Sequence, residues 1–232
     1  LIEVQLFHKF MHDQNALLDE LVRQRTKELR DTRLQIVRRL GRAAEFRDNE
    51  TGYHILRMSH SSVLLARALG WDEERCELLL HASPMHDVGK IGIPDSILLK
   101  PGKLDPDEWE VMKQHTSIGE HILDGDNSPL LVLAREIAKS HHEKWDGTGY
   151  PHSLKGEEIP ISGRIVALAD VFDALTSERP YKKAWSIEAA LEYIQGNSGA
   201  HFDPTLVHHF VRLLPQVLAI RTRFAEPTNH SH

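Results

Sequence analysis

The stretch DPDEWEVMKQHTSIGEHIL, residues 105–123, decides the fold class of this chain. It opens with Asp105, a residue type that caps helices, and with Pro106, which is favoured in the first helical turn. Glu108 stands three residues after the cap, where its carboxylate can complete a capping box. Apolar residues then recur at helical spacing. The stretch therefore predicts a helix that begins at Pro106 and contains His115.

Similar helix signals recur further along the chain. Asp203 and Pro204 precede a second apolar run with helical spacing. Ser186 precedes a third run, which Gly196 ends. Each of these starts predicts another helix.

Periodicity extends the helical assignment to the rest of the chain. Residues 130–140 and 161–175 show helical spacing, whereas the alternating pattern of a half-buried strand is nearly absent. We therefore predict an all-α chain, with loops at 89–104 and 143–160.

The first 40 residues have a different texture, with neither glycine nor proline and many Leu, Arg, Glu and Gln residues. As one helix they would extend about 60 Å, at about 1.5 Å per residue. Two interpretations stay open: a solvated connector, or a signalling helix that pairs in a homodimer. A partial apolar seam favours pairing, although polar residues interrupt its heptads. The seam consists of Leu18, Val22, Leu29, Ile36 and Leu40, and the interruptions are Arg25, Thr32 and Arg39.

These textures divide the chain into three parts. We predict a connector helix over 1–48, a catalytic domain over 49–218 and a tail over 219–232. Because the chain begins with Leu1 and not Met, we expect a piece of a longer protein, with a sensor or receiver domain upstream as in a response regulator.

Composition excludes several classes of protein. Of the 232 residues, 41 % are apolar and 27 % are charged, so the chain can bury an ordinary core, which excludes a disordered tail, a collagen-like repeat and a disulfide scaffold. The net charge of −6 makes binding to a nucleic-acid polymer an unfavoured function. The single cysteine, Cys76, argues against disulfides and thiolate metal sites. No apolar run is long enough for a membrane span, and we expect a cytoplasmic location.

Histidine is unusually frequent, with 16 residues against 14 glycines. Two motifs carry adjacent pairs: HDVGKIGIPD over 86–95 and HHEKWDGTGYP over 141–151. Glu50 and His54 lie four residues apart on one helix face, and Asp170 interrupts an apolar helix, where a carboxylate is costly without a partner. Taken singly, each residue also has an ordinary structural explanation, such as a core histidine or a first-turn acid.

Together these side chains form a ligand set. Five imidazoles and three carboxylates without a thiolate suit octahedral iron, manganese, nickel or cobalt better than tetrahedral zinc. Two such ions about 3.5–4 Å apart can support displacement at phosphorus.

The motifs resemble those of the HD-GYP family, a branch of the HD metal-dependent phosphohydrolases. The resemblance covers roughly residues 45 to 215 and rests on the His86-Asp87 dyad, on GYP at 149–151 and on HFDP at 201–204. It implies an HD-type helical bundle that hydrolyses the bacterial second messenger cyclic di-GMP to pGpG and often GMP. The implied reaction uses a metal-activated hydroxide and two or three divalent ions, with iron or manganese favoured over nickel, cobalt or zinc.

The resemblance also assigns roles to single residues. It implies that His86, Asp87 and Lys90 are catalytic, with Asp87 bridging two metals and Lys90 approaching the scissile phosphate. Arg179 and Lys182 match cations that hold the substrate phosphates. The implied metal ligands are Glu50, His54, His86, Asp87, His115, His141, His142 and Asp170. The GYP loop is implied to shape the substrate entrance and to contact diguanylate cyclases.

Two alternatives to this function stay open. The chain could be an HD phosphohydrolase for another cyclic dinucleotide, because the metal motif does not report on the base pocket. It could also be a nucleotide receptor or interaction module with a slow, metal-loaded site. The complete ligand set argues against this last interpretation.

Overall fold

The computed structural model describes residues 2–47, 52–125, 127–178 and 183–225. The chain divides into two compact units, Leu1–Val37 and Arg38–His232. Every regular element in the described ranges is helical, and their sole β-type pairing is an isolated bridge between Ser198 and Phe202. The predicted all-α class is therefore confirmed.

The predicted N-terminal helix is confirmed as α1 (Ile2–Phe46), 45 residues long. Within the first unit its apolar seam is exposed: Leu18, Val22 and Leu29 keep 56 %, 64 % and 60 % of their surface. Pairing of this seam with a second copy stays a prediction. Among the described residues, no helix is long and apolar enough to cross a bilayer.

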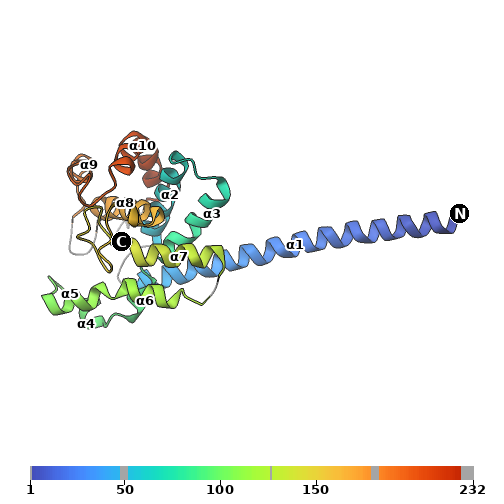
Figure 1. Cartoon of the computed structure of the whole chain (residues 1–232), viewed down its shortest axis with the longest axis horizontal. Coiled ribbons are helices and arrows are strands. Elements are labelled where there is room, and N and C mark those ends of the chain that lie inside the picture. The colour runs from blue at the N-terminus through green and yellow to red at the C-terminus, as the bar shows by residue number, and fades with distance from the viewer. Residues whose placement is uncertain (1, 48–51, 126, 179–182, 226–232) are drawn as a thin grey trace, which may run out of the picture. The chain divides into compact units, whose positions relative to one another are not determined.

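The second unit is built around α8 (Ile161–Thr176), which is buried on most of its circumference, as its nearly continuous apolar sequence requires. Figure 1 shows α8 among four neighbours that pack against it. These are α2 (Gly52–Ala68), α7 (Pro129–Ser140), α9 (Ile187–Gly196) and α10 (Pro204–Arg223). Helix α3 (Glu73–Ala82) covers α2 and α7.

The predicted helix starts are confirmed. Asp105 forms the capping box with Glu108, and the Ser186 hydroxyl accepts a hydrogen bond from the Ala189 amide. Asp203 caps α10, which continues past residue 218, where we place the end of the catalytic domain.

The prediction of one helix that begins at Pro106 and contains His115 is wrong. The stretch after Asp105 forms two helices, α5 (Pro106–Lys113) and α6 (His115–Ile122). At the break between the two helices, side chains donate hydrogen bonds to main-chain carbonyls. The His115 ring donates to the Met112 carbonyl at 2.7 Å, and the Thr116 hydroxyl donates to the Lys113 carbonyl at 2.9 Å. Such local bonds compete with the helical pattern.

The two predicted loops contain short helical turns. The first includes most of η2 (Val88–Gly92) and all of α4 (Asp95–Leu98), and the second includes η3 (Gly156–Glu158). Just before the first loop, η1 (Ser83–Met85) leads into the His86-Asp87 dyad.

Candidate metal centre

Five segments of the second unit deliver seven of the predicted ligands to one place. Helix α2 carries His54, and the junction of η1 and η2 carries His86 and Asp87. The remaining ligands come from the start of α6, the end of α7 and the middle of α8: His115, His141, His142 and Asp170.

These side chains form two groups. Within each group, the potential ligand atoms all lie within 4.8 Å of one another. The first group is Asp87, His115, His141 and His142, and the second is His54, His86 and Asp170. Both are consistent with a metal site that has nitrogen and oxygen donors and no sulfur.

Asp87 lies between the two groups. Its Oδ1 is 3.2 Å from His115 Nε2 and 3.5 Å from His141 Nε2, whereas its Oδ2 is 3.2 Å from His86 Nε2. One carboxylate thus offers one oxygen to each group, which is the arrangement that a bridging ligand needs.

The second group is organised around Asp170. Its Oδ1 lies 3.2 Å from His54 Nε2 and 3.9 Å from His86 Nε2. This contact explains how a carboxylate is accommodated on the apolar helix α8, as its position in the sequence required.

Main-chain carbonyls orient three of the imidazoles. The Nδ1 atoms of His86, His115 and His141 donate to the carbonyls of Ser83, Met112 and Ile137 at 2.9, 2.7 and 3.1 Å. A carbonyl can only accept, so each Nδ1 carries a proton and each Nε2 faces the site, where the neutral ring offers its lone pair.

Several buried atoms of the first group fit a cation. Asp87 Oδ1, His115 Nε2 and His141 Nε2 are buried and make no hydrogen bond to other described residues. Unsatisfied buried polar atoms are costly, and here three lone-pair donors face one another. A divalent ion would satisfy all three at once.

The ionisation of these groups matches that fit. Burial opposes the charge on Asp87, but Lys90 and His86 outweigh it and hold the carboxyl pKa well below its usual range. Burial lowers the pKa of His115 to about 4, and burial with the nearby His141 lowers the pKa of His142 well below its ordinary value. The Asp87 carboxylate is therefore ionised and the His115 and His142 rings are neutral, which are the forms that bind metals.

Lys90 lies beside the dyad, with its Nζ 2.8 Å from Asp87 Oδ2. The structure thus brings this predicted catalytic cation to the edge of the ligand cluster. The other predicted residues Glu50, Arg179 and Lys182 lie outside the described residues.

Sequence reasoning missed Asp173, a buried acid next to the second group. Its Oδ2 accepts a hydrogen bond from His54 Nδ1 at 2.9 Å. Its Oδ1 accepts hydrogen bonds from Arg57 Nε at 2.7 Å and from Arg221 Nη1 at 2.9 Å. Asp173 lies three residues after Asp170 on the same apolar helix, so the argument used for Asp170 could have found it.

Sequence reasoning also missed Glu143, which is only 2 % exposed. Its carboxylate accepts the backbone N–H groups of His152 at 2.8 Å and Leu154 at 3.0 Å. It therefore holds the segment just after the GYP triplet in the predicted loop 143–160, called the GYP loop here. Its position directly after the His141-His142 pair was the available signal.

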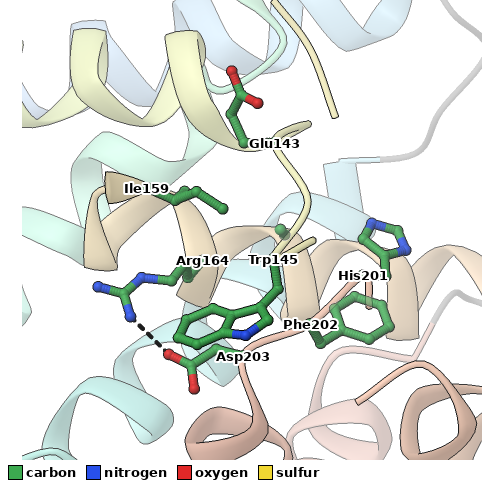
Figure 2. Close-up of a pocket in the computed structure, with 8 residues that line it drawn as sticks. Glu143, Trp145, Ile159, Arg164, His201, Phe202 and Asp203 are labelled. Carbon is green, nitrogen blue, oxygen red and sulfur yellow. Dashed lines mark hydrogen bonds and ion pairs between the residues drawn. The ribbon is translucent and has the colours of Figure 1, made fainter. Parts of the chain in front are cut away.

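The GYP loop is also tied to the HFDP segment. The N–H groups of Trp145 and Asp146 donate to the carbonyls of His201 and Ala200 at 3.1 and 2.9 Å. Figure 2 shows the pocket beside these bonds, where Trp145 lies near the ion pair of Arg164 and Asp203, whose charged atoms are 2.7 Å apart.

The middle of this loop, at Tyr150, reaches the ligand cluster. The Tyr150 ring stacks on His142, with ring centroids 4.8 Å apart and planes inclined by 22°. The loop thus forms part of the wall of the candidate metal centre.

Comparison with known proteins gives a consistent picture. A family model described as an HD domain matches residues 14–206. The chain is 47 % identical to a 3′3′-cGAMP-specific phosphodiesterase of Vibrio cholerae and 47 % identical to the cyclic di-GMP phosphodiesterase response regulator RpfG of Xanthomonas campestris. It is 45 % identical to a cyclic di-GMP phosphodiesterase of Thermotoga maritima.

These matches cover 84 %, 85 % and 93 % of this chain but only 37 %, 52 % and 59 % of the relatives. Among solved structures, a cyclic GMP-AMP specific phosphodiesterase of Vibrio cholerae matches with a TM-score of 0.62 at 22 % identity. That match covers 82 % of this chain and 52 % of the other, and it supports the fold.

Proposed function

The chain belongs to the HD-domain family, in its HD-GYP branch, and from this premise we propose that it hydrolyses the phosphodiester bonds of cyclic di-GMP to pGpG or onward to GMP. The observation that carries the proposal is the pair of His/Asp groups joined by Asp87. A site with two neighbouring clusters of hard and borderline donors suits phosphodiester hydrolysis.

The two groups would hold two divalent ions, and Glu50 would contribute to a third. Iron or manganese suits this donor set best, with nickel, cobalt or zinc as the other options. When bound, such ions act as Lewis acids and lower the pKa of water, which provides a nucleophile at neutral pH.

The chain's own residues have distinct tasks in this reaction. His86 and Asp87 keep the two groups adjacent, since Asp87 offers one oxygen to each. Lys90, 2.8 Å from Asp87, places a positive charge where a diester phosphate would approach. By their match to the family motif, Arg179 and Lys182 would hold the substrate phosphates.

The neutral imidazoles also serve the reaction. Because burial holds the pKa values of His115 and His142 low, these rings stay unprotonated at physiological pH. The stacked Tyr150 covers one face of His142 and limits access of bulk water to that side of the group.

A second candidate substrate is 3′3′-cGAMP. A Vibrio cholerae relative with that specificity is as similar to this chain as the cyclic di-GMP enzyme RpfG is. Both nucleotides contain the same type of phosphodiester, so the metal ligands do not distinguish them.

The test is hydrolysis by the purified chain, reduced and loaded with metal, on each nucleotide in parallel. We expect pGpG or GMP from cyclic di-GMP, and no product from an Asp87→Ala variant whose far-UV circular dichroism matches that of the wild type. A preference for 3′3′-cGAMP would replace the substrate assignment. Binding of nucleotide without product from either would favour the receptor alternative.

The remaining expectations are proposals of the same kind. A homodimer through α1, a diguanylate cyclase contact through the GYP loop, an upstream regulatory domain and a cytoplasmic location stay predictions. Relatives longer than this chain are in keeping with a further domain. Sedimentation at several concentrations tests the dimer.

A further inference from the structure

One arginine at the end of α1 binds the loop that carries Lys90. Arg47 Nη1 donates to the carbonyls of Lys90 at 3.2 Å and Ile91 at 2.5 Å. Its Nη2 donates to the Ile93 carbonyl at 3.1 Å and to Asp95 Oδ1 at 2.5 Å. A single guanidinium thus has four acceptors within six consecutive residues.

The chemistry of the loop explains why an arginine stands there. Main-chain carbonyls at the end of a short helix lack helical partners, and η2 ends at Gly92. Arginine presents several donors in a fixed planar fork, whereas lysine offers one compact charge. The side chain of Arg47 keeps 32 % of its surface exposed, so its charge is not fully desolvated.

The same end of α1 also contacts the segment before the dyad. Gly41 is buried, and a Cβ atom built on it would lie 2.5 Å from the Pro84 carbonyl oxygen. Pro84 belongs to η1, which leads directly to His86. Gly41 and Arg47 therefore contact the chain just before the dyad and from Lys90 onwards.

We propose that Arg47 is a positioning residue that acts on the proposed phosphodiester hydrolysis through Lys90. The Lys90 carbonyl is held by Arg47, while its Nζ reaches Asp87 at 2.8 Å. With both ends of the residue fixed, the ammonium stays at the edge of the cluster. Loss of the fork frees the backbone of this loop and leaves the metal ligands in place.

The decisive experiment is a double-mutant cycle in the full chain with Arg47→Ala and Lys90→Ala. Cyclic di-GMP and the chromogenic diester bis(p-nitrophenyl) phosphate serve as substrates. We expect Arg47→Ala to lower kcat about 10- to 100-fold, as misplacement of a charged group by about 1 Å does. In the Lys90→Ala background the same change should alter kcat by less than about twofold.

Arg47→Lys should recover only part of the loss, because one ammonium cannot bind four acceptors. Arg67→Ala is the matched control, since it removes an exposed ion pair between Arg67 on α2 and Glu73 on α3. Metal content, measured by elemental analysis, should be equal in all variants. An equal loss with and without Lys90 would overturn the proposal.

Amide hydrogen exchange provides a readout that does not depend on activity. The Ile93 N–H donates to the Lys90 carbonyl at 3.1 Å, so Arg47→Ala should speed exchange in the peptide 88–99 about tenfold. Unchanged exchange there would refute the positioning role. If the wild type cleaves neither diester, the proposed function fails, and exchange alone decides the role of Arg47.

Discussion

Replacing Gly89 with alanine should separate the dyad from one of its partner ligands. Gly89 lies in η2 between Asp87 and Lys90 and faces α6. A Cβ atom built on it would lie 1.8 Å from the His115 carbonyl oxygen and 2.5 Å from the Gly119 nitrogen. Real Cβ contacts are not shorter than 3.0 Å, so the two segments must move apart by 3.0 − 1.8 = 1.2 Å.

The cost follows from what the methyl group meets. Both neighbours are backbone atoms, which cannot rotate away as a side chain does, so we expect a destabilisation of about 3 kcal/mol, at the upper end of the range for overpacked sites. The movement displaces His115 relative to Asp87, and a misplacement of about 1 Å can lower the rate about 100-fold.

The assay is urea unfolding followed by circular dichroism, with chelator and with added metal, together with elemental analysis and kcat. Gly196→Ala is the matched control, because no atom lies within 4 Å of its Cβ position. That variant should stay within about 0.5 kcal/mol of the wild type. A Gly89→Ala protein with wild-type stability and full metal content would show that the close approach of η2 to α6 does not hold the site together.

Three further changes probe separate contacts. Asp173→Asn should weaken metal binding about 10- to 100-fold, because His54 loses the carboxylate that orients it; unchanged affinity in a chelator competition would contradict this. Burial lowers the pKa of His201 to about 4, so the unfolded chain binds a proton near pH 6.5 that the folded chain rejects. Stability should therefore fall as the pH drops from about 6.5 towards 4, by about 2 kcal/mol between pH 7.5 and 5. A His201→Asn variant should lack this loss of stability. If the free energy of unfolding falls equally with pH in the variant and in the wild type, His201 is not its source. Glu143→Ala should cost about 1–3 kcal/mol, because the His152 and Leu154 amides lose their acceptor, and it should expose the GYP loop to protease; an uncleaved loop would refute its anchoring role.

Helix starts could be predicted from the sequence because capping is local. Asp105 and Ser186 accept bonds from residues only three positions away, so a short stretch contains all the information. The break at Gln114 could not be predicted from the sequence. The Met112 and Lys113 carbonyls could equally have accepted the backbone N–H groups of a continuous helix in place of the His115 and Thr116 side chains.

The composition of the candidate site was predictable, but its internal arrangement was not. His54, His86 and Asp170 come from three distant segments: the sequence could assign them to one ligand set, but their separation from the group around Asp87 appears only in the structure. Asp173 was within reach of the argument applied to Asp170, but its partners were not, because Arg57 and Arg221 come from other helices. Arg47 could not be found, because an arginine after a helix is usually solvated and only tertiary packing gives it partners.

The way the imidazoles are held decides where the centre can vary. His86, His115 and His141 are fixed by carbonyls of the main chain, which no amino-acid substitution removes. His54 is fixed by a side chain, Asp173, whose charge is shared with Arg57 and Arg221. Inherited changes around Asp173 would therefore alter the basicity of His54, and with it the ion selectivity of the proposed second metal site, while the donors around Asp87 keep their orientation. Natural variation in metal selectivity should accordingly be concentrated where α8 contacts α2 and α10 around Asp173.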